Sequence, residues 1–203
     1  MATSPRALAL VCTLKPSPDA SSTELMARQV LQALAEQGVE GECVRIADHR
    51  IDPGVAVDMG DGDEWPRLRQ KLLEADVLVL ATPTWVGHMS SIAQRVLERL
   101  NAESSQTDDE GRPSMYGKVA VIAVVGNEDG AHKIVADCAQ ALSDTGFTIP
   151  ATGSTYWNSE AMNPKDYKDL DTTPEAVATT TATMARNAAH LARLLGERPY
   201  PAS

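Results

Sequence analysis

The stretch Val77-Leu78-Val79-Leu80-Ala81 is apolar at every position. A strand with one face in water alternates apolar and polar residues, whereas a strand covered on both faces has no need to alternate. Two further runs, residues 8–12 and 119–125, have the same continuous pattern. The three runs therefore predict the central strands of a parallel sheet that is covered by helices on both faces.

Segments with helical spacing separate these runs. A helix is predicted after Ser21, where Glu24 completes a capping box and Gly38 is a plausible stop. A second strand is expected at residues 42–47, with Cys43 or Val44 and Ile46 pointing inward. The other expected elements are helices at 65–73, 92–100 (capped by Ser90 or Ser91), 130–146 and 175–195, and a last strand at 147–155.

Strand and helix thus alternate along the whole chain, without an internal repeat or a linker. Crossovers between parallel strands are right-handed, so this alternation builds a doubly wound sheet. The expected fold is therefore α/β and flavodoxin-like, a five-stranded parallel sheet of order 2-1-3-4-5, in a single domain spanning residues 1–203.

The composition is that of a globular protein with an acidic surface. The 203 residues carry a formal net charge of -10 and no basic patch, which argues against nucleic acids and anionic membranes as partners. Cys12, Cys43 and Cys138 lie far apart and form no C-x-x-C motif, which favours reduced, buried thiols over disulfides or a metal site. Neither a signal peptide nor an apolar segment of membrane length is apparent, so a cytoplasmic protein is expected.

Ligands of such sheets bind outside the carboxyl ends of the strands, where the strand order reverses. Three segments then become candidates, namely loop 1 (residues 13–23), loop 2 (82–89) and loop 3 (126–132). No G-x-G-x-x-G and no G-x-x-x-x-G-K-[ST] follows the first strand, which disfavours a dinucleotide Rossmann site and excludes a P-loop NTPase. Asp and Glu are also scarce there, which disfavours a receiver-type magnesium site.

Loop 1 is rich in hydroxyl groups and leads into a helix. It contains Thr13, Ser17, Ser21, Ser22 and Thr23, together with one lysine. A helix N-terminus offers free N–H groups and the positive end of the helix dipole, both of which favour a phosphate. The alternative is that Ser21 or Ser22 merely caps the helix, but capping does not account for the whole cluster.

Loops 2 and 3 suit a flat ligand. Trp85 follows a buried strand and would pack on a ring face, while Gly87 permits close approach of the backbone. The glycines of loop 3 would likewise allow backbone contacts to ring atoms. The alternatives are ordinary packing for Trp85, a loop hydrogen bond for His88, and a plain helix cap by Asp129.

The sequence Pro83-Thr84-Trp85-Val86-Gly87-His88-Met89 resembles the P-T-x-x-G-x-M loop of multimeric flavodoxin-like quinone oxidoreductases. Together with loop 1 and the G-N-E-D-G of loop 3, it is similar to the flavodoxin-like NAD(P)H-dependent FMN reductases and quinone reductases, and the order of elements matches over about residues 6–157. Loop 1 departs from them, because Thr13-Leu14-Lys15-Pro16 stands where G-S-x-R is common. The cysteine motif of the related iron–sulfur flavoproteins is absent, so no Fe–S cluster is expected.

This resemblance implies FMN as cofactor and NAD(P)H as co-substrate, with no metal. The FMN phosphate would be bound by Thr13, Lys15, Ser17, Ser21, Ser22 and Thr23. The isoalloxazine and the ribityl chain would be lined by Pro83, Thr84, Trp85, Val86 and Gly87, and the other ring edge by Gly126, Asn127, Glu128, Asp129 and Gly130. No catalytic residue is singled out, and the candidates for contact with the flavin face are Trp85, His88 and Glu128.

The expected activity is hydride transfer from NAD(P)H and reduction of a quinone, flavin or similar small-molecule acceptor. The resemblance also implies a homodimer or homotetramer, for which residues 155–173, with their aromatic side chains, are the candidate contact; alternatively, this segment covers its own sheet edge. Two other functions stay open: an electron-transfer flavoprotein, and a flavodoxin-like interaction module without a cofactor.

Overall fold

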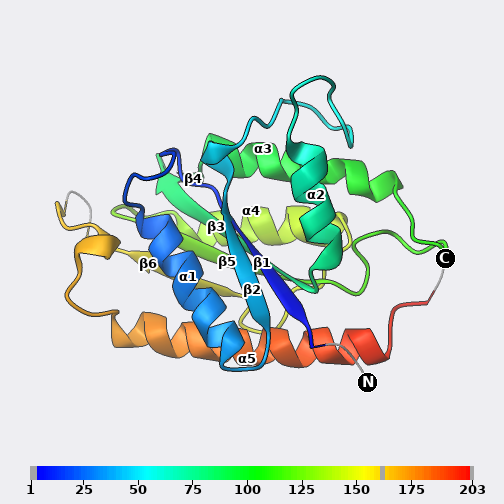
Figure 1. Cartoon of the computed structure of the whole chain (residues 1–203). Coiled ribbons are helices and arrows are strands. Elements are labelled where there is room, and N and C mark those ends of the chain that lie inside the picture. The colour runs from blue at the N-terminus through cyan, green and yellow to red at the C-terminus, as the bar shows by residue number, and fades with distance from the viewer. Residues whose placement is uncertain (1–3, 161–162, 202–203) are drawn as a thin grey trace.

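A twisted sheet runs through the middle of the molecule. The computed structural model describes residues 4–160 and 163–201. Five strands pair in parallel in the order β2-β1-β3-β5-β6 (Figure 1). Their bounds are β1 (Arg6–Val11), β2 (Glu40–Arg45), β3 (Val77–Trp85), β5 (Val119–Gly126) and β6 (Ser154–Asn158). The prediction of a flavodoxin-like doubly wound sheet is therefore confirmed, with the predicted order of the parallel strands.

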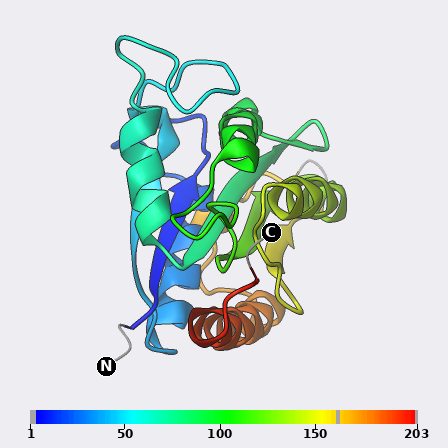
Figure 2. The same ribbon diagram turned by 90° about the vertical axis from the view of Figure 1, so that its right-hand side faces the viewer.

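Helices cover both faces of this sheet, as Figures 1 and 2 show. Successive residues of a strand point to opposite faces, so Val79 packs on one side and Leu80 on the other. The Val79 side is covered by α1 (Ser22–Ala35) and α5 (Glu175–Glu197). The Leu80 side is covered by α2 (Trp65–Glu74), α3 (Ser91–Leu100) and α4 (Ala131–Asp144). This two-sided burial explains why the central strands are apolar throughout.

Two features of the sheet differ from the sequence-based expectation. The short strand β4 (His88–Met89) pairs antiparallel with the end of β3 and forms a hairpin that was not predicted. The predicted last strand at 147–155 is mostly wrong, because residues before Ser154 contribute only a single bridge, between Val119 and Thr148. Pro150 has no N–H to donate to a ladder, so pairing starts after it.

Two of the three thiols are buried, as predicted. Cys12 and Cys138 are buried, Cys43 is half-buried, and all three are free. Burial raises the pKa of Cys138 to about 12, and it raises the pKa of Cys12 as well. Neither buried thiol therefore ionises near neutral pH, so both serve as core residues. Within the described residues, no helix is both long enough and apolar enough to cross a bilayer.

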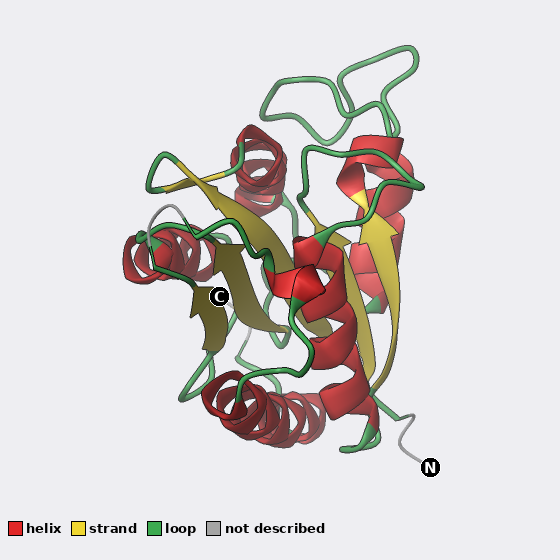
Figure 3. Cartoon of the chain, turned by 90° about the vertical axis from the view of Figure 1, so that its left-hand side faces the viewer, coloured by secondary structure: helices red, strands yellow, loops and turns green. Residues whose placement is uncertain are grey.

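The carboxyl ends of the strands lie at the left of Figure 1 and face the viewer in Figure 3. The start of α1, the β3–β4 hairpin and the segment that precedes α5 gather there. Segments that are far apart in sequence thus meet at the edge of the sheet where doubly wound folds bind their ligands.

Candidate functional site

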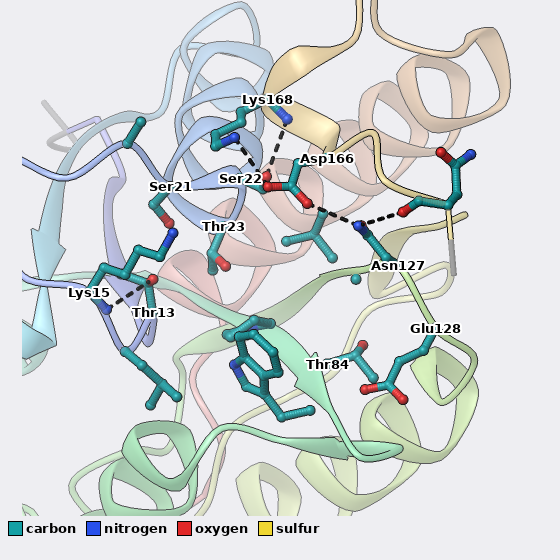
Figure 4. A pocket seen from close by; sticks show the side chains of 17 residues that line it. Thr13, Lys15, Ser21, Ser22, Thr23, Thr84, Asn127, Glu128, Asp166 and Lys168 are labelled. Carbon is teal, nitrogen blue, oxygen red and sulfur yellow. Dashed lines mark hydrogen bonds and ion pairs between the residues drawn. The ribbon is translucent and has the colours of Figure 1, made fainter. Parts of the chain in front are cut away.

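A cavity of about 490 Å³ opens at this edge of the sheet (Figure 4). Its size lies within the range of cofactor and small-molecule sites, roughly 300–1,000 Å³. All three predicted loops contribute to it, and so does the segment before α5. The lining residues are Thr13, Leu14, Lys15, Ala20, Ser21, Ser22, Thr23, Pro83, Thr84, Trp85, Val125, Gly126, Asn127, Glu128, Asn163, Asp166 and Lys168.

Loop 1 is held in place by side chains at the end of β2. The Arg45 guanidinium donates to the carbonyl oxygens of Lys15 (3.3 Å) and Asp19 (2.8 Å), and it pairs with Glu24 on α1. Asp48 accepts hydrogen bonds from the backbone N and the Oγ of Ser17, both at 2.6 Å, which lower the pKa of that carboxyl. Ser17 consequently turns to Asp48 and does not line the cavity.

The N-terminus of α1 forms one end of the cavity. The Ser21 side chain caps the helix by accepting from the backbone N of Glu24 at 3.3 Å, as predicted. The expected capping box is only half formed, because the Glu24 carboxylate pairs with Arg28 and Arg45 instead of reaching back. Among the described residues, no protein acceptor bonds the backbone N–H of Ser22 or Thr23. These N–H groups stay available for a ligand.

The end of β3 also lines the cavity. Thr84 is only 5 % exposed, and its Oγ1 is buried without a hydrogen-bond partner among the described residues. A buried hydroxyl without a partner is rare, and it points to a ligand or a solvent molecule that satisfies it. Gly126 lies directly against this side chain, because a Cβ atom there would come within 2.6 Å of the Thr84 Cβ. Trp85 is 52 % exposed at the rim.

The β3–β4 hairpin and loop 3 meet beside the cavity, where Val86, Gly87 and Gly130 lie outside its lining. Val86 and Gly87 form the tip of the β3–β4 hairpin, with positive φ angles of 53° and 70°. Glu128 lines the cavity, and its Oε1 accepts from the backbone N of Val86 at 2.7 Å, which ties loop 3 to the hairpin. Gly130 packs against Gly87, since a Cβ on Gly130 would lie 2.9 Å from the Gly87 Cα.

Two more of the predicted residues point away from the cavity. Asp129 accepts from the backbone N of Gly130 at 2.7 Å, and it does not line the cavity. The helix cap is Gly130 itself, without a side-chain hydrogen bond. His88 contacts the ammonium group of Lys133 at 3.2 Å on the outer side of the hairpin. The structure therefore gives no support to His88 as a residue at the flavin face.

The sequence analysis missed one wall of the cavity, formed by Asn163, Asp166 and Lys168. In Figure 4, Asp166 lies between Ser22 and Asn127. The Asp166 carboxylate accepts from Asn127 Nδ2 at 2.9 Å and pairs with Lys168 Nζ at 3.1 Å. The Lys168 bond and then the Asn127 bond lower the pKa of this carboxyl, so Asp166 is ionised at neutral pH. No spacing pattern pointed to these residues, because long-range folding brings them to the site.

The aromatic side chains of the same segment are largely engaged within the chain. Trp157 packs on the buried Tyr167, with ring centroids 5.4 Å apart. The Tyr156 hydroxyl and His132 Nε2 are hydrogen-bonded at 2.9 Å. This arrangement favours the alternative in which the segment covers its own sheet edge. Within the described part of the chain, no cluster of three or more His, Cys, Asp or Glu is arranged to hold a metal ion.

Comparison with known proteins gives a family for this architecture. Residues 5–162 match the model of the family described as NADPH-dependent FMN reductase. The 8-demethyl-8-aminoriboflavin-5'-phosphate synthase of Streptomyces davaonensis is 33% identical in an alignment of 207 positions, which covers 96% of this chain and 80% of that protein.

Two further proteins are similar to this chain. A crystal structure of RosB with the bound intermediate 8-demethyl-8-formylriboflavin-5'-phosphate superposes with a TM-score of 0.86 at 33% identity, covering 97% of this chain and 82% of that chain. The divalent metal cation transporter MntH of Mycobacterium bovis is 36% identical over 197 residues, 94% of this chain. This chain spans only 29% of the length of that transporter.

Proposed function

Because this chain belongs to the NADPH-dependent FMN reductase family, we propose that it binds FMN in the cavity and passes electrons from NAD(P)H to a quinone, flavin or similar small acceptor. The enzyme is thus an oxidoreductase whose family uses FMN and NADPH. The observation that carries the proposal is the pairing of a helix N-terminus with a buried, unpartnered Thr84 hydroxyl in one cavity of about 490 Å³.

The residues at the α1 end fit a phosphate group. The N–H groups of Ser22 and Thr23 are free, the Ser21, Ser22 and Thr23 hydroxyls line the cavity, and Lys15 adds a positive charge. These donors favour an anion locally in spite of the net charge of -10. We therefore assign the phosphate to loop 1, with Ser17 removed from the predicted set.

The residues at the other end fit a flat heterocycle. Thr84 Oγ1 needs a partner, Asn127 and the backbone of Gly126 offer polar groups, and Trp85 presents an aromatic surface at the rim. When bound, FMN supplies the two-electron chemistry of the reaction. The protein's contribution is to bind and orient it, and the described residues that line the cavity include no His and no Cys that would act as a base or nucleophile.

A second candidate function follows from one of the relatives. The RosB structure holds a flavin phosphate derivative as a bound intermediate, and its chain superposes on 97% of this one. The bound flavin phosphate would in that case be the substrate and be altered at its ring. Mass spectrometry of the flavin recovered after turnover separates the two functions: unchanged FMN indicates a cofactor, whereas a new flavin mass indicates a flavin-converting enzyme.

The test of the proposal combines binding with reduction. We expect titration of the purified protein to quench FMN fluorescence, and we expect stopped-flow mixing of the FMN-loaded protein with NADPH to bleach the flavin band, followed by reoxidation with a quinone. Binding of FMN with negligible reduction by NADPH or NADH would instead indicate an electron-transfer flavoprotein. A protein that purifies colourless and leaves FMN fluorescence unchanged would be a module without cofactor.

A single substitution tests the phosphate assignment. Ser22→Asp places a carboxylate at the free N–H groups of α1, where it repels a phosphate dianion and competes for its donors. We expect FMN affinity to fall by at least about tenfold, measured by fluorescence titration. Gln32→Glu is the control, because it adds one negative charge to α1 at an exposed residue outside the cavity lining. Equal FMN affinity of the Ser22→Asp variant and the unaltered protein would contradict the loop 1 assignment.

A further inference from the structure

One wall of the cavity lies outside the part of the chain that matches the family. The family match ends at residue 162, whereas Asn163, Asp166 and Lys168 follow it and line the cavity. These residues belong to the segment between β6 and α5, together with the short 3-10 helix Tyr167–Asp169. The family match therefore does not describe which ligand group these three residues recognise.

Lys168 lies directly over the N-terminus of α1. Its backbone N donates to the Oγ of Ser22 at 3.2 Å, which fixes residue 168 against the first residue of the helix (Figure 4). Its ammonium group pairs with Asp169 at 2.7 Å and with Asp166 at 3.1 Å. An ammonium group has three N–H donors, so these two carboxylates leave one donor for a ligand. The side chain is 25% exposed and lines the cavity.

Lys168 is one of few cationic side chains at the cavity. Among the lining residues, the cationic side chains are Lys15 and Lys168, and both are near the α1 end. The bond to Asp169 and then the bond to Asp166 raise the pKa of Lys168, so the ammonium is charged at neutral pH. The Ser22 hydroxyl already accepts from the Lys168 backbone, which leaves its own proton for an acceptor such as a phosphate oxygen.

We propose that Lys168 is a specificity-determining residue that recognises the 5'-phosphate and so makes this site prefer a phosphorylated flavin to riboflavin. The inference rests on the proposed binding of FMN in this cavity. Loop 1 offers one cationic side chain to the phosphate, that of Lys15, and Lys168 adds a second. The hydrogen bond from the Lys168 backbone to Ser22 places this second lysine at the same end of α1. Asp166 holds the ammonium at the cavity and partly neutralises it, so Asp166 limits the strength of phosphate binding.

The experiment compares FMN with riboflavin, which has the same ring and ribityl chain but no phosphate. We expect Lys168→Met to weaken FMN binding by about tenfold and to change riboflavin binding by less than about twofold, in fluorescence titrations. Lys168→Arg keeps the charge and is expected to retain FMN affinity within about threefold. The matched control is Lys165→Met, which removes a lysine of the same segment that pairs with Asp171 and lies outside the cavity lining.

A second variant is expected to change FMN affinity in the opposite direction. Asp166→Asn keeps an acceptor for Asn127 but removes the negative charge that neutralises Lys168. We expect FMN to bind about two- to fivefold more tightly to this variant, with riboflavin unchanged, because only the phosphate responds to the gain in local positive charge. A purely structural role of the segment would weaken both flavins together and would not tighten either.

The outcomes separate the two proposals. Equal losses for FMN and riboflavin in Lys168→Met, or no loss for either, overturn the role of Lys168 while the proposed FMN site stands. A similar loss of FMN affinity in Lys165→Met also overturns the role of Lys168, since any lost positive charge in this segment would then have the same effect. Failure of the unaltered protein to bind FMN overturns the proposed function and this inference together.

Discussion

Arg99 is fully buried, and its guanidinium organises the long loop between β2 and α2. It donates to the carbonyl oxygens of Asp52 at 2.9 Å and Ala56 at 3.0 and 3.2 Å, and it pairs with Asp63 at 2.8 Å. Asp63 also accepts from the backbone N of Met59 and of Trp65. A buried charge is tolerated only when it is paired and hydrogen-bonded in this way, so the pair holds residues 49–64, which contain no helix or strand.

We expect Asp63→Asn to lower the free energy of unfolding by about 3 kcal/mol at pH 7, because Arg99 then stays buried without a counter-ion. Urea unfolding measures this loss. Asp61→Asn in the same loop is the control, since Asp61 is exposed, and its expected change is below about 0.5 kcal/mol.

The same pair predicts a pH dependence. Burial alone would raise the pKa of Asp63, but hydrogen bonds from Arg99 and from the backbone N–H groups of Met59, Trp65 and Asp52 lower it to about 2. A depressed pKa contributes stability that is complete above the unfolded value of about 3.9 and is lost as the pH falls toward the folded value. The difference between the unaltered protein and Asp63→Asn should therefore be largest at pH 7 and shrink between pH 4 and pH 2. An equal difference at pH 3 would show that the ionised carboxylate is not the cause.

Site residues next to a strand or a helix start are easier to predict than site residues in the middle of a loop, because the loop decides where their side chains point. Thr13 follows β1, Ser22 begins α1 and Thr84 lies near the end of β3, and all three line the cavity. Ser17 lies among them in sequence, yet Asp48 pulls it away from the cavity. Lys168 enters the site from a distant segment, and nothing in its local sequence indicates the contact with Ser22.

The β3–β4 hairpin carries backbone strain at its tip. Val86 has a φ of 53°, a left-handed conformation that is unfavourable for a β-branched residue, and the side chain is 85 % exposed. Two-residue hairpin turns with positive φ at both positions prefer Asn-Gly. Here Val86 precedes Gly87, and the high exposure of the valine side chain leaves it little packing against the described residues to offset the strain.

We expect Val86→Asn to raise the free energy of unfolding by about 1 kcal/mol, because asparagine adopts this conformation more readily. The midpoint of thermal unfolding should rise by about 2–4 °C for a chain of this size. Gly87→Ala is the matched substitution of opposite sign: it meets no atom within 4 Å, so any loss comes from its φ of 70° alone. The comparison is made at protein concentrations at which single chains prevail, and a destabilised Val86→Asn variant there would contradict the argument from strain.

The apolar runs explain why most strands were predictable and a few were not. The three central strands are buried on both faces, so their sequences are apolar without interruption. The edge strand β6 has no such run, because Tyr156 and Asn158 are exposed, and its start was therefore predicted seven residues too early, at 147 instead of 154. The strand β4 has only two residues, too few for any periodicity to show.

Three exposed apolar side chains lie on the loops around the cavity. Leu14 is 47% exposed, Trp85 52 % and Val86 85 %, although the surface as a whole is acidic, with a net charge of -10. Clustered apolar residues on an otherwise charged surface are typical of a protein–protein contact. The predicted homodimer or homotetramer stays a prediction, but this rim is a better candidate for its contact than the aromatic residues of 155–173, which pack within the chain.

We expect the unaltered protein to sediment at two or four times the chain mass of 21.7 kDa in analytical ultracentrifugation. Val86→Asp places a charge at the most exposed point of the rim and outside the cavity lining, so it should lower the mass to that of one chain while FMN still binds. Val86→Gly controls for the loss of the valine without adding a charge. A single-chain mass for the unaltered protein would contradict the prediction, whereas an oligomer that Val86→Asp leaves intact would place the contact elsewhere on the surface. An oligomer that buries this rim would also narrow access to the cavity.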